Sequence, residues 1–281
     1  MFINGHDDIL EREIISMISN KNIVITGASS GIGFETLKLL AKGTGNKILA
    51  VARKPENLEG FAANVIPFAA DVSSKEGVDS IFAKAEELFG KIDIFFANAG
   101  FPYYEAYDYV DWDRIERIFN TNTLSPIYTY AKYVEHLNDR EGHLAMTISA
   151  MGQMAMPGYA LYGATKFGLE GFQQGIRIEM PKNLTMTCLY PVSTATNFFK
   201  VAADGKKVDK PFPVQKPEVV AKKMVKAMEK GKESVFPCGL FVFAKLLMGH
   251  IPPVRSFYWG MERKKFERHL LKTQNKTLKI K

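Results

Sequence analysis

A tyrosine and a lysine stand four residues apart in the stretch YALYGATKFG, at Tyr162 and Lys166. Residues at positions i and i+4 share one face of a helix and lie a few Å apart. A lysine cation beside a phenol favours the phenolate and lowers the pKa of the phenol from about 10. This spacing also arises by chance on many helices, so it predicts a proton donor or acceptor only if the remaining chain builds a site around it.

The elements that would position this pair alternate regularly along the chain. Short β-branched runs begin near Asn22, Ile48, Val65, Ile94, Leu144, Met186 and Val235. Amphipathic patterns such as DSIFAKAEELFG and PEVVAKKMVKAMEKG lie between them and are typical of helices. A strand followed by a helix, repeated about seven times, predicts an α/β fold with one doubly wound parallel sheet covered by helices on both faces. We expect a single domain.

Three glycines follow the first expected strand in VITGASSGIGFETLKLL, at Gly27, Gly31 and Gly33. Glycines in such a loop let the backbone turn tightly and approach a pyrophosphate, which the positive end of the following helix attracts. A glycine triplet alone is a weak signal, but here the strand, loop and helix that give it meaning are all present. The segment therefore predicts a dinucleotide site on a Rossmann-like sheet.

Five motifs in order along residues 21–237 resemble those of the short-chain dehydrogenase/reductase family. They are TGASSGIG from Thr26 to Gly33, DV at Asp71, the Asn98-Ala99-Gly100 segment of FFANAG, Asn122 in FNTNTLSP, and Ser149 thirteen residues before Tyr162 with Gly152 and Pro157 between them. The resemblance implies hydride transfer between a nicotinamide and a carbonyl or alcohol carbon. Chance would not assemble these motifs at the right separations.

The resemblance also implies a role for each of four catalytic residues. Tyr162 would give a proton to the nascent alkoxide or take one from an alcohol, and Lys166 would tune that phenol and bind the nicotinamide ribose. Ser149 would hydrogen bond to the substrate oxygen, and Asn122 would bend its helix and support a water chain from Lys166. The alternatives are a plain strand-end hydroxyl for Ser149 and a helix or turn cap for Asn122.

The cofactor is expected to be NADP(H) rather than NAD(H). An NAD enzyme places an acid on the ribose about 20 residues beyond the glycines. Here Ala52, Arg53 and Lys54 stand at that place, and the first acid is Glu56. Arg53 and Lys54 would attract a 2′-phosphate. The expected cofactor-binding residues are Gly27, Ser29, Ser30, Gly31, Ile32, Gly33, Arg53, Lys54, Asp71, Val72, Asn98, Ala99, Gly100, Tyr162, Lys166, Pro191, Thr194 and Thr196.

One segment departs from the family pattern. After the sixth strand the family usually reads Pro-Gly-x-Val-x-Thr, whereas this chain has PVSTAT with Val192 in the glycine place. Pro191 and Thr196 still match, so Thr196 is a candidate for the nicotinamide carboxamide. Valine has less backbone freedom than glycine, so the path of this loop is open at this point.

The substrate end is expected in residues 197–216, which show little periodicity and cap the substrate in the family. Phe198 and Phe199 could form an apolar lid or pack onto the core. Aromatic and methionine side chains that flank the catalytic motifs would line the pocket, namely Phe101, Tyr103, Met151 and Tyr159. Such a lining favours a hydrophobic carbonyl or alcohol compound as the small-molecule substrate, over a sugar.

Composition and charge exclude several classes of protein. The chain has 281 residues and a net charge of +7, but eight Lys or Arg against two Glu lie in residues 262–281, so the body is nearly neutral. We expect no nucleic-acid partner, since such an enzyme would carry its charge on the body. Two cysteines suit a reducing cytoplasm. Residues 1–20 do not read as a signal peptide and predict a leader or a short amphipathic helix. No metal site is expected.

Residues 238–281 form an unusual extension, first apolar, then aromatic, then basic. The apolar run is too short to span a membrane. It would cover the substrate pocket, form a dimer interface, or lie in a membrane interface with Tyr258 and Trp259 at headgroup level. Family members that act on lipid-like substrates, such as 3-ketosphinganine reductases, have comparable extensions, so a long-chain ketone is a candidate substrate.

A homodimer or tetramer is expected. The alternatives to a reductase are a nucleotide-sensing protein and an NAD-dependent alcohol dehydrogenase.

Overall fold

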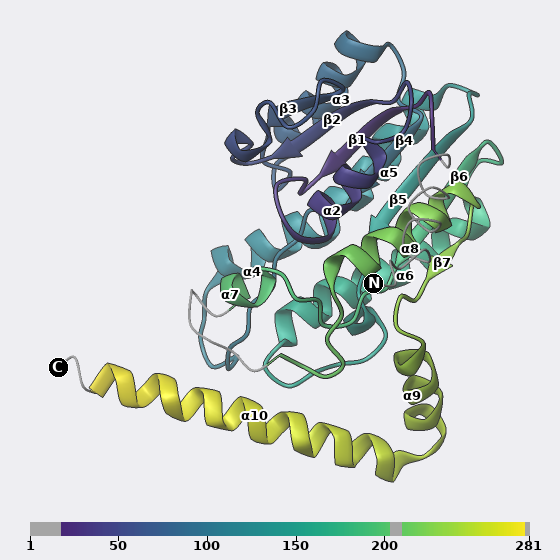
Figure 1. Ribbon diagram of the computed structural model, residues 1–281. Helices are drawn as coiled ribbons and strands as arrows, with labels where there is room; N and C mark the ends of the chain where they lie inside the picture. The colour runs from purple at the N-terminus through teal and green to yellow at the C-terminus, as the bar shows by residue number, and fades with distance from the viewer. Residues whose placement is uncertain (1–17, 203–209, 279–281) are drawn as a thin grey trace, which may run out of the picture.

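A computed structural model of the protein describes residues 18–202 and 210–278. Its described residues contain seven strands in one sheet, and every neighbouring pair is parallel (Figure 1). The order is β3-β2-β1-β4-β5-β6-β7, which confirms the predicted doubly wound sheet. The strands are β1 (Asn22–Thr26), β2 (Lys47–Ala52), β3 (Val65–Ala69), β4 (Ile94–Ala97), β5 (Gly142–Thr147), β6 (Leu184–Leu189) and β7 (Ser234–Val235).

Helices connect the strands and continue beyond the last one. The α-helices are α2 (Gly31–Leu40), α3 (Lys75–Phe89), α4 (Trp112–Phe119), α5 (Ser125–Leu137), α6 (Ala160–Glu179), α7 (Phe198–Ala202), α8 (Pro217–Glu229), α9 (Gly239–His250) and α10 (Pro252–Leu278). Three shorter helical segments are η1 (Glu56–Leu58), η2 (Asn120–Leu124) and η3 (Ala150–Gly152).

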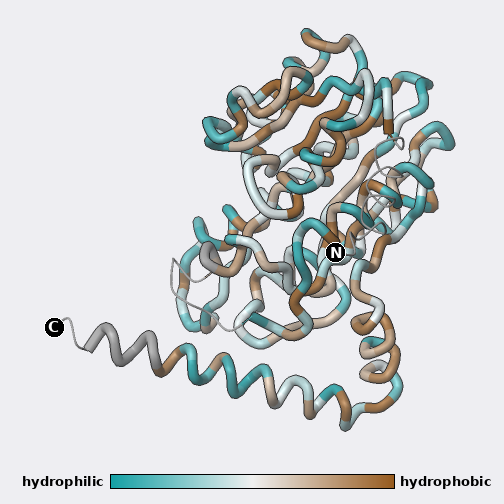
Figure 2. The backbone as a smooth tube through the Cα atoms, in the orientation of Figure 1, coloured by the Kyte–Doolittle hydropathy of each residue, from teal (hydrophilic) through white to brown (hydrophobic). Residues whose placement is uncertain are grey.

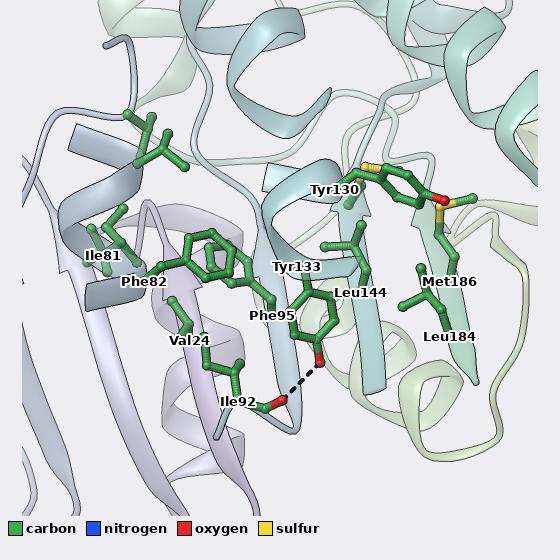
Figure 3. Close-up of a cluster of buried hydrophobic side chains, with 14 of the residues drawn as sticks. Val24, Ile81, Phe82, Ile92, Phe95, Tyr130, Tyr133, Leu144, Leu184 and Met186 are labelled. Atoms are coloured by element: carbon green, nitrogen blue, oxygen red, sulfur yellow. Dashed lines mark hydrogen bonds between the residues drawn. The ribbon is translucent and has the colours of Figure 1, made fainter. Parts of the chain in front are cut away.

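Successive side chains of the buried strands point to opposite faces of the sheet and so divide the core into two layers. Val24 and Leu49 point to the face that α3, α5 and α6 cover, where they pack with Phe95 and Tyr133 (Figure 3). Ile23, Ile25 and Ile48 point to the other face, which α2 and α8 cover. Both faces of the strands are therefore apolar, as expected for a parallel sheet buried on both sides. The Tyr133 hydroxyl also donates a hydrogen bond to the Ile92 carbonyl oxygen at 3.2 Å (Figure 3).

The direction in which the chain adds strands to the sheet reverses between β1 and β4, and the predicted motifs meet at this point. The chain winds from β1 outward through β2 and β3, then returns to β4 on the other side of β1. The backbone amides of Asn98 and Ala99 both donate to the Thr26 hydroxyl, each at 3.1 Å. This topology opens a crevice at the carboxyl ends of β1 and β4, where ligands bind in sheets of this kind.

A turn of π-helix joins α4 to α5 and contains Asn122. The segment η2 covers Asn120–Leu124 and continues without interruption into α5. Such single wide turns inside α-helices occur often at functional sites. This departure from α-helical geometry at Asn122 agrees with the predicted local bend.

The amino-terminal boundary differs slightly from the prediction. Ile18 is buried in the core beside α2, and the Asn20 amide donates to the Thr44 carbonyl oxygen at 2.8 Å. The globular unit therefore includes residue 18 rather than beginning at 21, because an apolar side chain in this short segment fills the core. The leader predicted for residues 1–20 otherwise lies outside the described residues.

The carboxyl-terminal extension folds into two helices that leave the sheet after β7. Helix α9 runs away from the sheet, and α10 turns back across the end of the molecule that carries α7 (Figure 1). Within residues 18–202 and 210–278, no helix combines the length and the hydropathy that crossing a bilayer requires.

Candidate active site

Tyr162 and Ser149 meet at the carboxyl end of β5. Tyr162 lies in the first turns of α6 and is only 5% exposed, and Ser149 lies just before η3. Burial raises the pKa of the Tyr162 phenol to about 12, and its hydrogen bond with the Ser149 side chain acts in the opposite direction. The Ser149 hydroxyl also accepts the Met151 amide at 3.0 Å, which fixes its position. A phenol and a hydroxyl held together in this way are suited to donating a proton and a hydrogen bond to one substrate oxygen.

Lys166 lies one turn beyond Tyr162 on the same face of α6, as its spacing predicts. Its Nζ is 5.9 Å from the Tyr162 ring centroid and donates to the Thr147 carbonyl oxygen at 2.9 Å. Burial lowers the pKa of Lys166 to about 7. The predicted lowering of the Tyr162 pKa by this lysine is wrong for the protein as described, because burial dominates and raises that pKa to about 12.

Asn122 locks the loop after β4 to the π-helical turn. Its side-chain oxygen accepts the Phe101 amide at 3.0 Å, and its Nδ2 donates to the Phe101 carbonyl oxygen at 2.8 Å. A third bond joins Nδ2 to the Thr165 hydroxyl at 3.2 Å. A Cβ added at Gly100 would lie 3.1 Å from the Asn122 oxygen and 3.7 Å from the Lys166 amine. Asn122 is fully buried and does not line the cavity, so the structure gives it a positioning role beside Lys166.

The glycine loop has the geometry that its sequence predicts. Gly27 and Gly31 have positive φ angles of 66° and 59°, which side chains rarely tolerate. A Cβ at Gly33 would lie 2.3 Å from the Gly27 carbonyl oxygen. The loop can therefore close tightly onto the amino end of α2 only with glycine at these positions. The open amides of that helix end suit a pyrophosphate.

One cavity of about 480 Å³ runs from this loop past Tyr162. Its lining includes nearly all of the predicted cofactor residues: Gly27, Ser29, Ser30, Gly31, Ile32, Arg53, Asp71, Val72, Asn98, Ala99, Gly100, Tyr162, Lys166, Pro191, Thr194 and Thr196. Gly33 lies behind the loop, and Lys54 is exposed outside the cavity. The crevice, the helix end and the glycine cradle together fit a nicotinamide dinucleotide.

The end of the cavity beyond the glycine loop is positively charged. Arg53 follows β2 and lines the cavity with Ser29 and Ser30. Burial would raise the pKa of Asp71, but hydrogen bonds from Ser73 and the charges of Arg53 and Arg117 outweigh it and lower that pKa. Asp71 is therefore a fixed carboxylate close to the Arg53 cation.

The PVSTAT loop keeps an ordinary backbone at the unusual valine. Val192 is not among the described residues with positive φ, so the position that is usually glycine needs no glycine conformation here. Its side chain packs partly buried beside Ala150 and Phe241. Thr196 approaches the glycine loop, since its Cγ2 would lie 3.2 Å from a Cβ on Gly31. The path of this loop therefore needs no glycine at position 192, because the valine side chain there packs against an apolar cluster.

The opposite end of the cavity is apolar. Phe198 and Phe199 of α7 both line it, and Phe199 also packs into the adjoining cluster, so both interpretations of this pair hold. Phe101 and Met151 line it as predicted. Tyr103 and Tyr159 do not, because they are buried one layer behind in that cluster. The remaining apolar side chains there are Met154, Met156, Phe212, Phe241 and Tyr258.

The extension closes this apolar end. Tyr258 of α10 donates to the Phe212 carbonyl oxygen at 3.1 Å, and the Trp259 indole donates to the Ala155 carbonyl oxygen at 3.0 Å. Phe266 packs edge-on against Tyr104, 5.4 Å between ring centroids. Of the three interpretations of the extension, the structure shows cover over the pocket. Tyr258 and Trp259, which the membrane interpretation placed at headgroup level, each donate one hydrogen bond to the domain, and contact of the extension with a membrane stays a prediction.

Sequence reasoning missed several residues of the site. Arg117 and Thr121 line the cavity from the helix that carries Asn122, and their i, i+4 spacing on one helix face was an available signal. Asn57 donates to the Ser29 carbonyl oxygen at 2.8 Å and so supports the glycine loop. Phe241 and Tyr258 come from the extension, and no local pattern near the motifs pointed to them.

A family model described as "short chain dehydrogenase" matches residues 21–207. The chain belongs to the short-chain dehydrogenase/reductase family. It is an oxidoreductase of the class that acts on alcohol and carbonyl groups with a nicotinamide cofactor. The architecture, the tyrosine–lysine pair and the glycine loop agree with this membership.

Similar proteins include characterised and uncharacterised members. The "Uncharacterized oxidoreductase Lmo0432" of Listeria monocytogenes is 31% identical over 66% of this chain and 79% of its own length. The "3-dehydrosphinganine reductase" of Danio rerio is 28% identical over 88% of this chain and 80% of its own length. An alcohol dehydrogenase from the archaeon Thermococcus sibiricus, solved with 5-hydroxy-NADP, has a TM-score of 0.68 at 26% identity and covers 76% of this chain and 94% of its own.

Proposed function

We propose that this protein is an NADP(H)-dependent reductase of hydrophobic, long-chain carbonyl compounds. The observation that carries this proposal is the contrast between the two ends of one cavity. Arg53 lies at one end, and methionine and aromatic side chains line the other. Tyr162 and Ser149 lie between the two ends. A site of this shape holds a charged cofactor and an apolar substrate on either side of one proton donor.

The residues of the chain divide the chemistry among them. The bound nicotinamide would supply the hydride to the carbonyl carbon. Ser149 would hydrogen bond to the carbonyl oxygen and hold it beside Tyr162, which donates its proton as negative charge develops there. Burial keeps the Tyr162 phenol protonated at neutral pH, as reduction requires. Lys166, whose pKa lies at about 7, is poised to carry a proton toward that phenol, and Asn122 holds the adjoining loop in place.

The substrate class follows from the apolar end. Met151, Met154 and Met156 contribute flexible thioethers that adapt to an alkyl chain. Phe241 and Tyr258 extend the apolar surface outward from the catalytic pair. The reductase from Danio rerio, similar over most of both chains, has a name that denotes a long-chain ketone substrate. A ketone with a long alkyl chain is therefore the substrate class that fits best.

The cofactor preference rests on Arg53. Replacing Arg53 with alanine is expected to raise the Kd for NADPH about tenfold, because a charge-assisted bond to the 2′-phosphate is lost. The Kd for NADH should barely change. Lys54→Ala is the matched control, since Lys54 does not line the cavity, and it should leave both constants near wild type. Fluorescence titration of wild type and both variants with each of the two cofactors, six pairs in all, measures this. An equal rise in the Kd for NADPH and the Kd for NADH in Arg53→Ala would contradict the role of Arg53 at the 2′-phosphate.

The direct test of the function is NADPH consumption by the purified protein against ketones of increasing chain length. We expect kcat/KM to rise with chain length until the apolar end is filled, at about threefold or more per methylene buried. NADPH should be used in preference to NADH. Tight NADPH binding without turnover of any ketone would contradict the proposal and favour a nucleotide-sensing role.

Three further expectations from the sequence stay predictions. They are a cytoplasmic location, a homodimer or tetramer, and contact of the extension with a membrane surface.

A further inference from the structure

Helices α9 and α10 expose a concentrated apolar surface, here named the docking face. Eight of the eighteen exposed large hydrophobic side chains among the described residues lie between residues 240 and 261. They are Leu240, Val242, Phe243 and Leu246 of α9, Ile251 at the turn, and Val254, Phe257 and Met261 of α10. Figure 2 shows the hydrophobic colour along much of α9 and brown segments between hydrophilic ones at the start of α10. Surfaces of this concentration in soluble proteins mark interaction sites.

The docking face is distinct from the side of α10 that packs on the domain. Val254, Phe257 and Met261 recur at helical spacing, and Lys264 and Arg268 continue the same stripe toward the carboxyl end. Glu262 and Phe266 are turned toward the domain instead, where Glu262 is 5% exposed. The outer side of α10 is therefore apolar near α9 and basic farther along.

The charge of these two helices is one-sided. No Asp or Glu occurs between Glu233 and Glu262. Residues 239–271 hold six Lys or Arg and only two Glu. Each of those acids already has a cation beside it, Lys265 on Glu262 at 2.6 Å and Arg263 on Glu267 at 2.9 Å. Of the other cations, Lys264 and Arg268 are exposed beside the apolar surface, whereas Lys245 donates to the Gln153 side chain at 2.6 Å.

We propose that the docking face binds an anionic lipid bilayer. Helices that lie in the interface plane present apolar side chains to the acyl boundary and basic side chains to the headgroups. Phe243, Leu246 and Phe257 would enter the boundary, and Lys264 and Arg268 would contact anionic headgroups, each cation adding to the attraction. A second copy of the chain fits less well, because both Glu of residues 239–271 already pair with a cation and would leave the exposed cations of the other copy without an acidic partner.

The docking face also borders the apolar end of the cavity. Phe241 lines the cavity from the inner side of α9, and Tyr258 lines it from the inner side of α10. Phe212 lines the cavity too and is 61% exposed. A long-chain ketone dissolved in the bilayer would therefore reach Tyr162 without crossing water. This delivery step rests on the proposed reductase function, whereas the docking itself does not.

Flotation of the full chain with vesicles tests the docking. Wild-type protein should rise with vesicles of phosphatidylcholine and phosphatidylserine at low salt. Phe243→Glu and Phe257→Glu should each lower the partition coefficient about tenfold or more, because a charge replaces an inserted ring. Lys264→Glu should lower it about fivefold, and only with anionic vesicles. Ile178→Glu is the matched control, an 89% exposed apolar position on α6, and should float like wild type.

Two further readouts separate the possible failures. All variants should turn over a short, water-soluble ketone at the wild-type rate, while Phe243→Glu loses turnover of a vesicle-borne long-chain ketone. Wild-type protein that stays at the bottom of the flotation gradient would overturn the docking. A dimer of the wild type that Phe243→Glu dissociates would instead assign the docking face to a second copy of the chain. Flotation without turnover of any ketone would leave the docking standing and contradict the proposed function.

Discussion

Replacing Tyr162 with phenylalanine is expected to lower kcat for carbonyl reduction about a thousandfold and to leave NADPH binding within about twofold of wild type. In the proposed function the phenol is the proton donor, and positioned general acids contribute about 10²- to 10⁴-fold to rate. The ring itself stays in place, because its packing against Phe198 and Tyr159 does not involve the hydroxyl. Only the proton and the hydrogen bond with Ser149 are removed.

Tyr159 supplies a matched control for this experiment. It lies three residues earlier, its ring centroid is 6.4 Å from that of Tyr162, and it is equally buried. Its hydroxyl has no hydrogen-bond partner among the described residues. Tyr159→Phe should therefore keep full activity and should raise the free energy of unfolding by about 1 kcal/mol, since an unpaired buried hydroxyl destabilises the fold.

Steady-state kinetics and NADPH titration of both variants decide the assignment. Loss of turnover in Tyr162→Phe together with normal activity in Tyr159→Phe is the expected result. Comparable activity in the two variants would show that another group supplies the proton.

Replacing Lys166 with methionine is expected to stabilise the cofactor-free protein at pH 7 by about 2 kcal/mol while it abolishes turnover. Burial lowers the pKa of Lys166 from 10.5 to about 7, so keeping this lysine destabilises the native state by about 4 kcal/mol at that pH. The variant leaves the Thr147 carbonyl oxygen without its donor, which costs about 1 to 2 kcal/mol. Methionine has a similar length and no charge to bury.

The pH dependence of this stability has a definite sign. The pKa of Lys166 is about 7 in the native state and near 10.5 in the unfolded chain. Between these values the unfolded chain binds a proton that the native state does not, so the free energy of unfolding of the wild type rises with pH. Lys166→Met lacks this slope. The advantage of the variant should therefore be full below pH 7, still large at pH 7, and should shrink toward pH 10.5.

Urea unfolding of wild type and Lys166→Met at pH 7 and pH 9 measures both quantities. A constant difference between the two proteins at both pH values would show that the Lys166 pKa is not lowered by burial. A stable variant that retains reductase activity would contradict the role given to Lys166 in catalysis.

The sequence by itself determined the fold class and the glycine loop, and it predicted the candidate catalytic residues. These features depend on local signals: the alternation of strands and helices, glycines whose φ angles are fixed by a tight turn, and the i, i+4 spacing of Tyr162 and Lys166. The bend at Asn122 was also predicted, because the family motif places an asparagine at one defined helix turn. The order of motifs along the chain carried this information without any long-range contact.

The tertiary structure decided the properties that depend on burial and on distant segments. Burial outweighs the hydrogen bond with Ser149 and raises the pKa of Tyr162, which spacing alone could not reveal. Arg53 reaches the cavity and Lys54 does not, although the two are adjacent in sequence. Tyr258 and Trp259 bond to the domain through partners more than forty residues away, whereas Phe257 beside them is 77% exposed. Composition places an apolar and basic helix in the chain, but only packing decides which of its faces remains outside.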